Sequence, residues 1–534
     1  MLTIRLPLTL LCVLATGCAS MVRGTTRSLD LAPNGLSRAD DGFRRSLSAG
    51  AYQQAFLRAA SPKRGAPDDA LLRGLYRGLT AFHAGNWSAS ATAFADADRL
   101  VERRLTRSIS REAATLVAND LVLAYLPTRT ERLFLRYYAM HAHARGGNTE
   151  GAVVEARRLG RDLEHASSEL SEAEKPVHAA MRDAAGAIFE SAGEHNDALV
   201  SYRNAALLRG TSRALVDSIA LSPPPADSAT LIVFVESGWV AHRVDQGLTI
   251  GLDDGWAPRR RPDGDRERGS TDSTATDRFA PEELAQYALQ FLDATPDGGV
   301  FGIDGRGDWS RVNRPMRVGP VSSSFVRVAW PALVRTPFAP GGLSLLLHRG
   351  AVGQGAPEES AGDQGPAVRS LAHGADISAA LGADIRRARA AMLVRAATRA
   401  LSRGALTRKL REKHGEWASV AASLAGSVVE RADTRSWQLL PGFVSMVRVT
   451  VPAGLHDVAV RIGADEPGVA ARLPQQELKG GQTVVTTVRV WRDASQFAPV
   501  VATTRDTFEV LTRKGSEVGP ASASPAQRPA IPPR

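Results

Sequence analysis

The sequence is poor in cysteine and has no long hydrophobic run. Its 534 residues include only two cysteines, Cys12 and Cys18. The apolar run from Leu6 to Leu14 is about ten residues long, which suits the core of a signal peptide, whereas a transmembrane helix needs about 20. Residues 1–17 are therefore expected to be a signal peptide. Its removal leaves a single thiol, and that count excludes a disulfide, a zinc site and a cysteine nucleophile.

Small residues stand directly before the second cysteine. Ala15-Thr16-Gly17-Cys18 resembles the lipobox of bacterial lipoproteins, although the lipobox usually has Leu, Val or Ile where this chain has Ala15. The resemblance implies cleavage before Cys18, a lipid on its thiol, and a lipidated linker over residues 18–37. The alternative is an ordinary secretory signal cut elsewhere. By analogy with the sorting rule of enteric bacteria, Ala19 in place of Asp favours the outer over the inner membrane of the cell envelope.

A strong charge of one sign is also missing. The 66 basic and 56 acidic residues leave a net charge of +10. This mild excess suits a protein near anionic lipid or cell-wall polymer and gives little support to nucleic acid as a partner. The length and the 43% hydrophobic content predict two or three domains with a sizeable core.

Common catalytic motifs are absent from the sequence. It has no G-x-S-x-G, no H-E-x-x-H and no P-loop. His141 and His143 are two residues apart, so on a helix they diverge by about 200° and cannot share a metal. We therefore expect no enzyme activity, no catalytic residue, no metal and no cofactor.

The chain divides at Ser222-Pro-Pro-Pro-Ala226, a stiff spacer that cannot continue a helix. Residues 38–221 are alanine-rich and periodic at helix spacing. The stretch from Leu75 to Ala97, with Gly78, Gly85 and Phe94, resembles a tetratricopeptide repeat. A second such stretch contains Gly186, Gly193 and Tyr202, and a weaker one contains Gly147. The intervals of 62 and 46 residues between the turn glycines exceed the family period of about 34, so extra helices are expected.

Residues 228–512 carry the β-branched runs of a β-rich domain, either a sheet or a sandwich. Strands are expected over Thr230–Glu236, Ser324–Ala329, Leu343–Leu347, Val444–Val451, Leu455–Ile462, Thr483–Trp491 and Thr507–Leu511. A helical insertion is expected over 376–431, with one helix over Asp376–Arg403 and another near Trp417–Arg431. Residues 513–534 are rich in Pro, Ala and Ser and should form a disordered tail. The fold class is thus α+β, with a tetratricopeptide-like helical domain before the β-rich one.

Several segments together resemble a family of uncharacterised bacterial lipoproteins of tetratricopeptide type, a conserved orthologous group. The segments are Asn119-Asp120 with Tyr125, Val154 to Arg158, Val233 to Gly238, and Ala432-Asp-Thr-Arg-Ser-Trp437. The resemblance implies a helical half, a β-rich half and an envelope location. It implies no catalytic residues.

Each candidate site residue has a functional and a structural interpretation. Asp433, Arg435 and Trp437 could bind an anionic group against a flat wall, but an internal Arg435–Asp433 pair with Trp437 as an anchor is favoured. Glu155, Arg157 and Arg158 could be ligands, but ion pairs across a helical hairpin are favoured. Asn119 and Asp120 could cap or bridge helices.

Two surfaces remain as candidates for binding. Counting from the turn glycines places four residues on the groove of the repeats: Tyr137, His141, Asp183 and Glu190. The alternative is that the β-rich half or a neighbouring helix covers this groove. Arg395, Arg399 and Arg403 form a basic stripe that could meet lipid phosphates, although such a stripe is more often a solvated face.

The favoured function is that of a membrane-anchored envelope scaffold or adaptor, which binds a protein or peptide through its helical repeats. One alternative is a module that binds cell-wall glycan or lipid. Another is a hydrolase with an unrecognised site, in which Asp433 or Glu155 would meet a histidine in a deep pocket.

Overall fold

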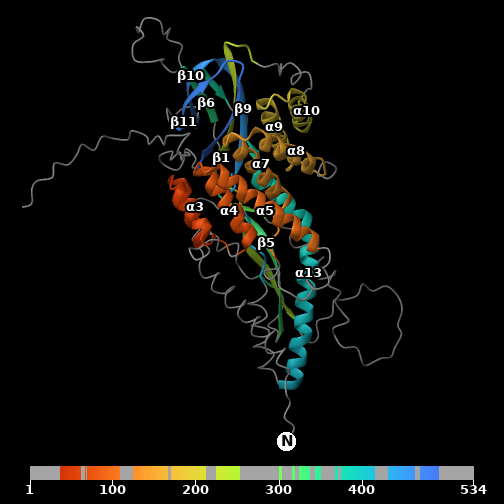
Figure 1. Cartoon of the computed structure of the whole chain (residues 1–534). Coiled ribbons are helices and arrows are strands. Elements are labelled where there is room, and N and C mark those ends of the chain that lie inside the picture. Colours follow the sequence, from red (N-terminus) through yellow and green to blue (C-terminus); the bar gives the residue numbers. More distant parts are fainter. Residues whose placement is uncertain are drawn as a thin grey trace, which may run out of the picture.

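The computed structural model describes residues 36–61, 67, 69–108, 124–165, 170–211, 224–252, 300–302, 316–318, 324–336, 343–349, 367–370, 374–414, 431–462 and 469–491. Within these ranges the chain has nine α-helices and twelve strands, so the α+β class is confirmed (Figure 1). The predicted signal peptide, nearly all of the linker, the disordered tail and the helix near residue 417 lie outside them. None of the described helices is long and apolar enough to cross a membrane.

Eight helices come first and form consecutive pairs. They are α2 (Arg38–Ser48) with α3 (Tyr52–Ala60), α4 (Ala70–His83) with α5 (Trp87–Ser108), α7 (Arg129–Arg145) with α8 (Thr149–His165), and α9 (Lys175–Ser191) with α10 (His195–Leu208). In each pair a three-residue turn joins the helices, and its middle residue is a glycine with a φ of 74 to 79°: Gly50, Gly85, Gly147 and Gly193. A left-handed residue ends a helix in this way because glycine has no Cβ penalty there.

The first sheet has the order β12-β1-β9-β8. Its central strand β1 (Ser228–Ser237) runs parallel to β12 (Thr483–Val490) and antiparallel to β9 (Phe443–Pro452), and β8 (Ala375–Asp376) pairs with β9. Because strand side chains alternate, Ile232 and Phe234 face the helices, while Leu231 and Val233 face the other way.

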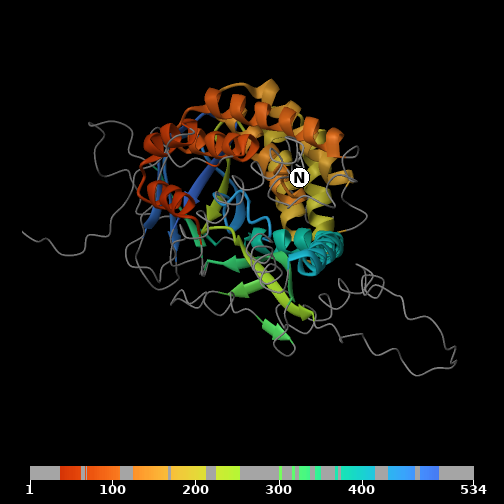
Figure 2. The same ribbon diagram turned by 90° about the horizontal axis from the view of Figure 1, so that it is seen from below.

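A second sheet packs against this other face. Its order is β11 (Val469–Leu478), β10 (Gly454–Ile462), β6 (Leu343–Arg349) and β7 (Ala367–Ser370). Leu345 on β6 and Val458 on β10 join Leu231 and Val233 in one apolar cluster. The body therefore has three layers, with helices, first sheet and second sheet in that order (Figures 1 and 2).

The third sheet has the order β3 (Val300–Gly302), β5 (Ser324–Arg335), β2 (His242–Leu252) and β4 (Met316–Val318). The long helix α13 (Ile377–His414) packs along β5. Together β2, β5 and α13 extend from the body toward the lower end of Figure 1.

Most of the predicted elements are present where the structure describes the chain. β1, β6, β9, β10 and β12 lie where strands were expected, whereas β5 and α13 continue further than predicted. The sequence analysis did not predict β2, β3, β4, β7, β8 or β11. It predicted no individual helices for the pair α2–α3, which lies within the predicted helical range 38–221. The strand expected at Thr507–Leu511 lies outside the described ranges.

Candidate functional site

The four residues predicted to line a groove lie beneath the first sheet. Tyr137 and His141 on α7 are 0% and 1% exposed, and Asp183 and Glu190 on α9 are 3% and 5% exposed. The rings of His141 and Tyr137 lie 5.3 and 6.1 Å from that of Phe234 on β1. The sequence analysis predicted an open groove at these residues. The prediction is wrong, because the chain's own first sheet covers this face of the helices.

The two predicted acids, Asp183 and Glu190, have basic partners. The carboxylate of Glu190 accepts hydrogen bonds from Arg448 on β9, the shortest 2.8 Å long, and from the Tyr202 hydroxyl at 2.9 Å. Asp183 pairs with Arg209. Burial raises the pKa of Asp183, and the Arg209 guanidinium opposes that shift. Glu190 thus joins the helical layer to the first sheet, whereas Asp183 joins α9 to the end of α10 within the helical layer.

A third acid on this face, Glu236 at the end of β1, was not predicted as a site residue. It is 1% exposed and accepts a hydrogen bond of 2.8 Å from the Tyr138 hydroxyl. Arg489 on β12 lies 3.4 Å away and also stacks over the Trp491 ring at 4.5 Å. Burial raises the pKa of Glu236, with Arg489 acting in the opposite direction. The sequence did carry a signal for the buried pair of Glu236 and Arg489, because Glu236 is an acidic residue at the end of an otherwise apolar strand.

The segment from Asp433 to Trp437 lies between the helices and the sheets. The Arg435 guanidinium donates two hydrogen bonds of 2.8 Å to Asp433. Trp437 is fully buried, with its ring 5.8 Å from that of Phe94, and its backbone N–H donates to Glu131 at 2.7 Å. This arrangement is the internal pair and anchor that the sequence analysis favoured over a ligand site.

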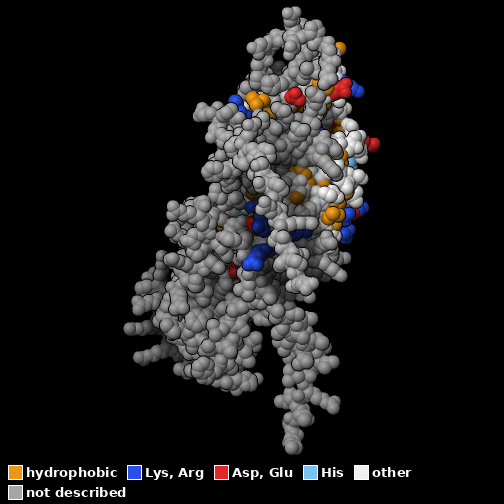
Figure 3. All heavy atoms as spheres, turned by 90° about the vertical axis from the view of Figure 1, so that its left-hand side faces the viewer, with side chains coloured by type: hydrophobic (Ala, Val, Ile, Leu, Met, Phe, Trp, Pro, Cys, Tyr) orange, Lys and Arg blue, Asp and Glu red, His pale blue; other side chains and the backbone are white. Residues whose placement is uncertain are grey.

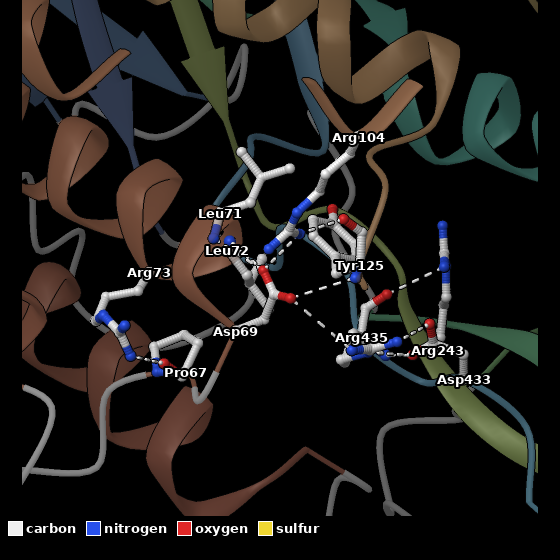
Figure 4. Close-up of polar contacts among 10 residues, drawn as sticks. All are labelled: Pro67, Asp69, Leu71, Leu72, Arg73, Arg104, Tyr125, Arg243, Asp433 and Arg435. Atoms are coloured by element: carbon white, nitrogen blue, oxygen red, sulfur yellow. Dashed lines mark hydrogen bonds and ion pairs between the residues drawn. The ribbon is translucent and has the colours of Figure 1, made fainter. Parts of the chain in front are cut away.

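Figure 4 shows that Arg435 belongs to a larger set of polar contacts, which we call the Asp69 junction: Asp69, Arg104, Tyr125, Asp433 and Arg435. Asp69 caps α4 by accepting from Leu71 N–H at 2.8 Å. Its carboxylate also lies 2.9 Å from Arg104, 3.2 Å from Tyr125 N–H and 4.0 Å from Arg435.

Charge at the Asp69 junction is balanced. Burial by itself would raise the pKa of Asp69, but hydrogen bonding and the positive charge of Arg104 outweigh it and lower the pKa. Burial would also lower the pKa of Arg435, and Asp433 reverses this shift. The acidic and basic groups of the Asp69 junction therefore stabilise one another in their charged forms. Such an arrangement suits a structural connection better than proton transfer.

The predicted cluster on α8 forms ion pairs with neighbouring helices. Glu155 accepts from Arg158 at 2.9 Å and from Arg136 of α7 at 3.3 Å. Arg157 reaches Glu194, which precedes α10, at 2.6 Å. These contacts match the structural interpretation, and the described partners of Glu155 and Asp433 are arginines. Cys18, Asn119 and Asp120 lie outside the part of the chain that the structure describes.

An open hollow of about 500 Å³ lies between the start of α4 and the middle of α5. Its lining includes Gly74, Ala97 and Leu100 together with three charged residues, Asp96, Arg99 and Arg103. Arg99 pairs with Asp96 at the surface. Among the residues described, no group of three or more His, Cys, Asp or Glu side chains is placed to hold a metal.

Comparison of the chain with models of protein families, with curated proteins and with solved structures found no match. The argument for function therefore rests on the chain's own surfaces. The buried polar groups join the helical layer to the first sheet, and the surfaces left for binding lie on the outside of the layers.

Proposed function

We propose that the protein is a lipid-anchored scaffold of the bacterial cell envelope. Cys18 would carry the lipid, and Ala19 favours the outer membrane by the sorting analogy. The helical layer would bind a partner protein or peptide through its outer face. This proposal keeps the adaptor role expected from the sequence but moves the binding surface from the inner groove to the outside.

The repeated geometry of the helical layer supports a tetratricopeptide-like origin. Four helix pairs share the same three-residue glycine turn, and the two turns at Gly50 and Gly85 are 35 residues apart, close to the family period of about 34. In two pairs a glycine lies against an aromatic ring of the next helix: Gly78 against Phe94, and Gly186 against Tyr202. Helical repeats of this kind commonly serve as binding surfaces.

The observation that carries the proposal is the distribution of exposed aliphatic side chains. Large hydrophobic residues that are exposed in the described part of the chain all lie on the helical layer: Leu57, Leu105, Val154, Val200 and Leu207. Val200 and Leu207 are each 55% exposed and lie two turns apart on α10. Figure 3 draws the face at the left-hand side of Figure 1, where hydrophobic side chains also reach the surface among charged ones. Val200 and Leu207 on α10 therefore offer the apolar contact that a partner protein would cover.

Crosslinking in cells tests this proposal. The full lipidated chain is crosslinked and its partners are identified by mass spectrometry, beside the double variant Val200→Lys/Leu207→Lys. Both side chains are exposed, so the variant should fold, and we expect it to lose the partner. Asn196→Lys adds a charge at an exposed polar position of the same helix and should keep it.

A Cys18→Ala variant separates the anchor from the binding surface. We expect this variant to attach to the membrane less firmly, and to yield fewer crosslinks to a partner that is held in the envelope. Crosslinks that stay unchanged in the α10 double variant would show that α10 is not the binding surface. Crosslinks confined to the protein itself would remove the adaptor role.

A further inference from the structure

The first half of α13 is fixed to the body. Ile377, Ala380 and Leu381 lie in the core shared with the helical layer and the first sheet. One turn further on, the Asp384 carboxylate accepts a hydrogen bond of 2.9 Å from Thr130 N–H at the start of α7. The helix therefore leaves the body in a defined direction.

The charge of Arg387 in this docked half is compensated by two acids. Arg387 donates to both carboxylate oxygens of Glu174, at 2.7 and 2.8 Å, and lies 3.3 Å from Asp384. Glu174 directly precedes α9, so the contact ties α13 to a second helix of the layer.

The second half of α13 has a very different charge balance. Residues 395–414 contain seven basic residues and one acid, a net charge of 7 − 1 = +6, while the whole chain has 66 − 56 = +10. The basic residues are Arg395, Arg399, Arg403, Arg408, Lys409, Arg411 and Lys413, and the acid is Glu412. More than half of the net positive charge of the chain thus falls within these twenty residues.

Helix register groups most of these positions. At about 100° per residue, positions 395, 399, 403, 409 and 413 fall within an arc of about 120°. Leu393 and Ala396 are fully buried on the same helix, and their midpoint is rotated by about 110° from the centre of that arc. The basic positions are therefore offset from Leu393 and Ala396, and beyond the body they continue the side of α13 on which Ile377 and Leu381 pack in the first half.

The second half of α13 also extends away from the other helices. Figure 1 shows its last turns at the lower end of the molecule, beyond the helical layer, and Figure 2 looks along this extension. The basic half of α13 thus lies at one end of the described part of the chain.

We propose that the second half of α13 binds the surface of an anionic lipid bilayer. Clusters of four to eight Lys and Arg on one helix suit the phosphates of such a surface, and Leu406 and Leu410, which fall within the same arc, add apolar contact with the lipid. Single-stranded nucleic acid is the weaker match, because residues 395–414 contain no Phe, Tyr or Trp on which bases could stack.

This contact does not depend on the proposed acyl group or on the proposed partner surface. It would give the protein a second attachment to the membrane and would fix the orientation of the body above it. An attached chain with both contacts should stay on the membrane more firmly than one with a lipid alone, because stable anchoring usually takes two signals.

Vesicle sedimentation of the full chain carrying Cys18→Ala tests the proposal without any acyl chain. The vesicles contain phosphatidylglycerol with phosphatidylcholine, or phosphatidylcholine alone. We expect at least about tenfold stronger binding to the anionic vesicles, weakening with added salt. Changing Arg395, Arg399, Arg403, Lys409 and Lys413 to Gln should abolish this preference.

A charge-matched control changes five exposed arginines of the helical layer to Gln: Arg45, Arg77, Arg99, Arg103 and Arg161. The control should retain the preference for anionic vesicles, and so should a variant with Lys at positions 395, 399 and 403. Circular dichroism of each variant establishes that it is folded.

Three outcomes would overturn the proposal. The first is equal binding to neutral vesicles, and the second is binding that the α13 variant and the control reduce alike. The third is tighter binding of a single-stranded oligonucleotide than of the anionic vesicles at the same salt concentration. None of these results bears on the partner surface at Val200 and Leu207, so the two proposals can fail separately.

Discussion

At the scale of single residues, Glu236 and Arg489 place opposite charges inside the core. They lie on the neighbouring strands β1 and β12 and are 1% and 3% exposed. Besides each other, they have the Tyr138 hydroxyl and the Gly238 carbonyl as polar partners. A buried charge whose partner is removed stays in a medium of low dielectric constant without compensation, which is more costly than replacing both groups with uncharged ones.

A double-mutant cycle measures this coupling. We expect Arg489→Met to lower the free energy of unfolding by about 3–5 kcal/mol, and Glu236→Gln to lower it by a similar amount. The double variant should lose clearly less than the sum, since neither charge is then left alone. Urea denaturation at neutral pH provides the four values.

An exposed pair gives the matched control for this cycle. Arg45 pairs with Asp41 on α2, and the Arg45 side chain is 75% exposed. Arg45→Met should cost less than about 1 kcal/mol because solvent screens the pair. Strict additivity in the Glu236 and Arg489 cycle would contradict the coupling that their geometry implies.

Single residues also show what sequence reasoning could reach. Local periodicity assigned Tyr137, His141, Asp183 and Glu190 to one side of the helices, and these four do share the inner side. It could not show what lies opposite, because the partner of Glu190 is Arg448, 258 positions away in the chain. The internal pair Asp433–Arg435 was accessible to sequence reasoning because its members are two residues apart.

At the scale of elements, the helix pairs depend on close contact at glycine. A Cβ placed on Gly78 would lie 2.6 Å from Phe94 Cε1, and one on Gly186 would lie 2.8 Å from Tyr202 Cε1. Real Cβ atoms do not approach carbon so closely, so a methyl group at either position must push the second helix of the pair outward. Gly160 on α8 offers the opposite case, since a Cβ there would meet nothing within 4 Å.

We predict that Gly78→Ala and Gly186→Ala each destabilise the protein by about 1–3 kcal/mol through overpacking. Gly160→Ala should instead stabilise it by up to about 1 kcal/mol, because alanine loses less backbone entropy in a helix. The three variants add the same methyl group to a helix and differ in what that group meets. Thermal or urea denaturation compares them, and equal effects at all three sites would show that the pairs are not closely packed.

Two of the strands that the sequence analysis missed share a physical reason. β2 alternates polar and apolar residues weakly and contains Gly247 and Gly251, while β11 contains Pro474. Such residues lower strand propensity, so only pairing with other strands identifies the segment. β1 was predicted because its apolar run is long enough to be recognised without its neighbours. The helix pair α2–α3 was also missed. Its turn contains Gly50, which has the same place as Gly85 in the turn of the next pair.

At the scale of the whole molecule, the helical and β-rich halves share one core. Phe43 and Phe134 from the helices lie in the same buried cluster as Phe234, Trp437 and Trp491 from the strands and the segments near them. Composition divided the chain at the proline spacer, because each half keeps one kind of periodicity. It could not reveal that the inner faces of both halves cover each other, since that depends on shape.

This shared core links acid sensitivity in one half to unfolding of both. Burial lowers the pKa of His141 to about 3 and that of His178 to about 4, and it lowers the pKa of His83 well below the usual 6.5. Below pH 6.5 the unfolded chain therefore binds protons that the folded chain does not. The stability from each histidine is present above pH 6.5 and is lost as the pH falls toward the folded-state pKa, by about 1.4 kcal/mol per pH unit.

We therefore predict a lower melting temperature at pH 5 than at pH 7, and a smaller difference in His141→Leu. All three histidines lie in the helical layer, whereas seven of the eight tryptophans, including Trp437 and Trp491, lie in residues 228–512. If the halves share one core, far-ultraviolet circular dichroism and tryptophan fluorescence should report the same transition at both pH values. A helical signal lost at pH 5 before the fluorescence changes would mean that the helical layer unfolds alone, and that the sheet holds its structure without the helices that cover it.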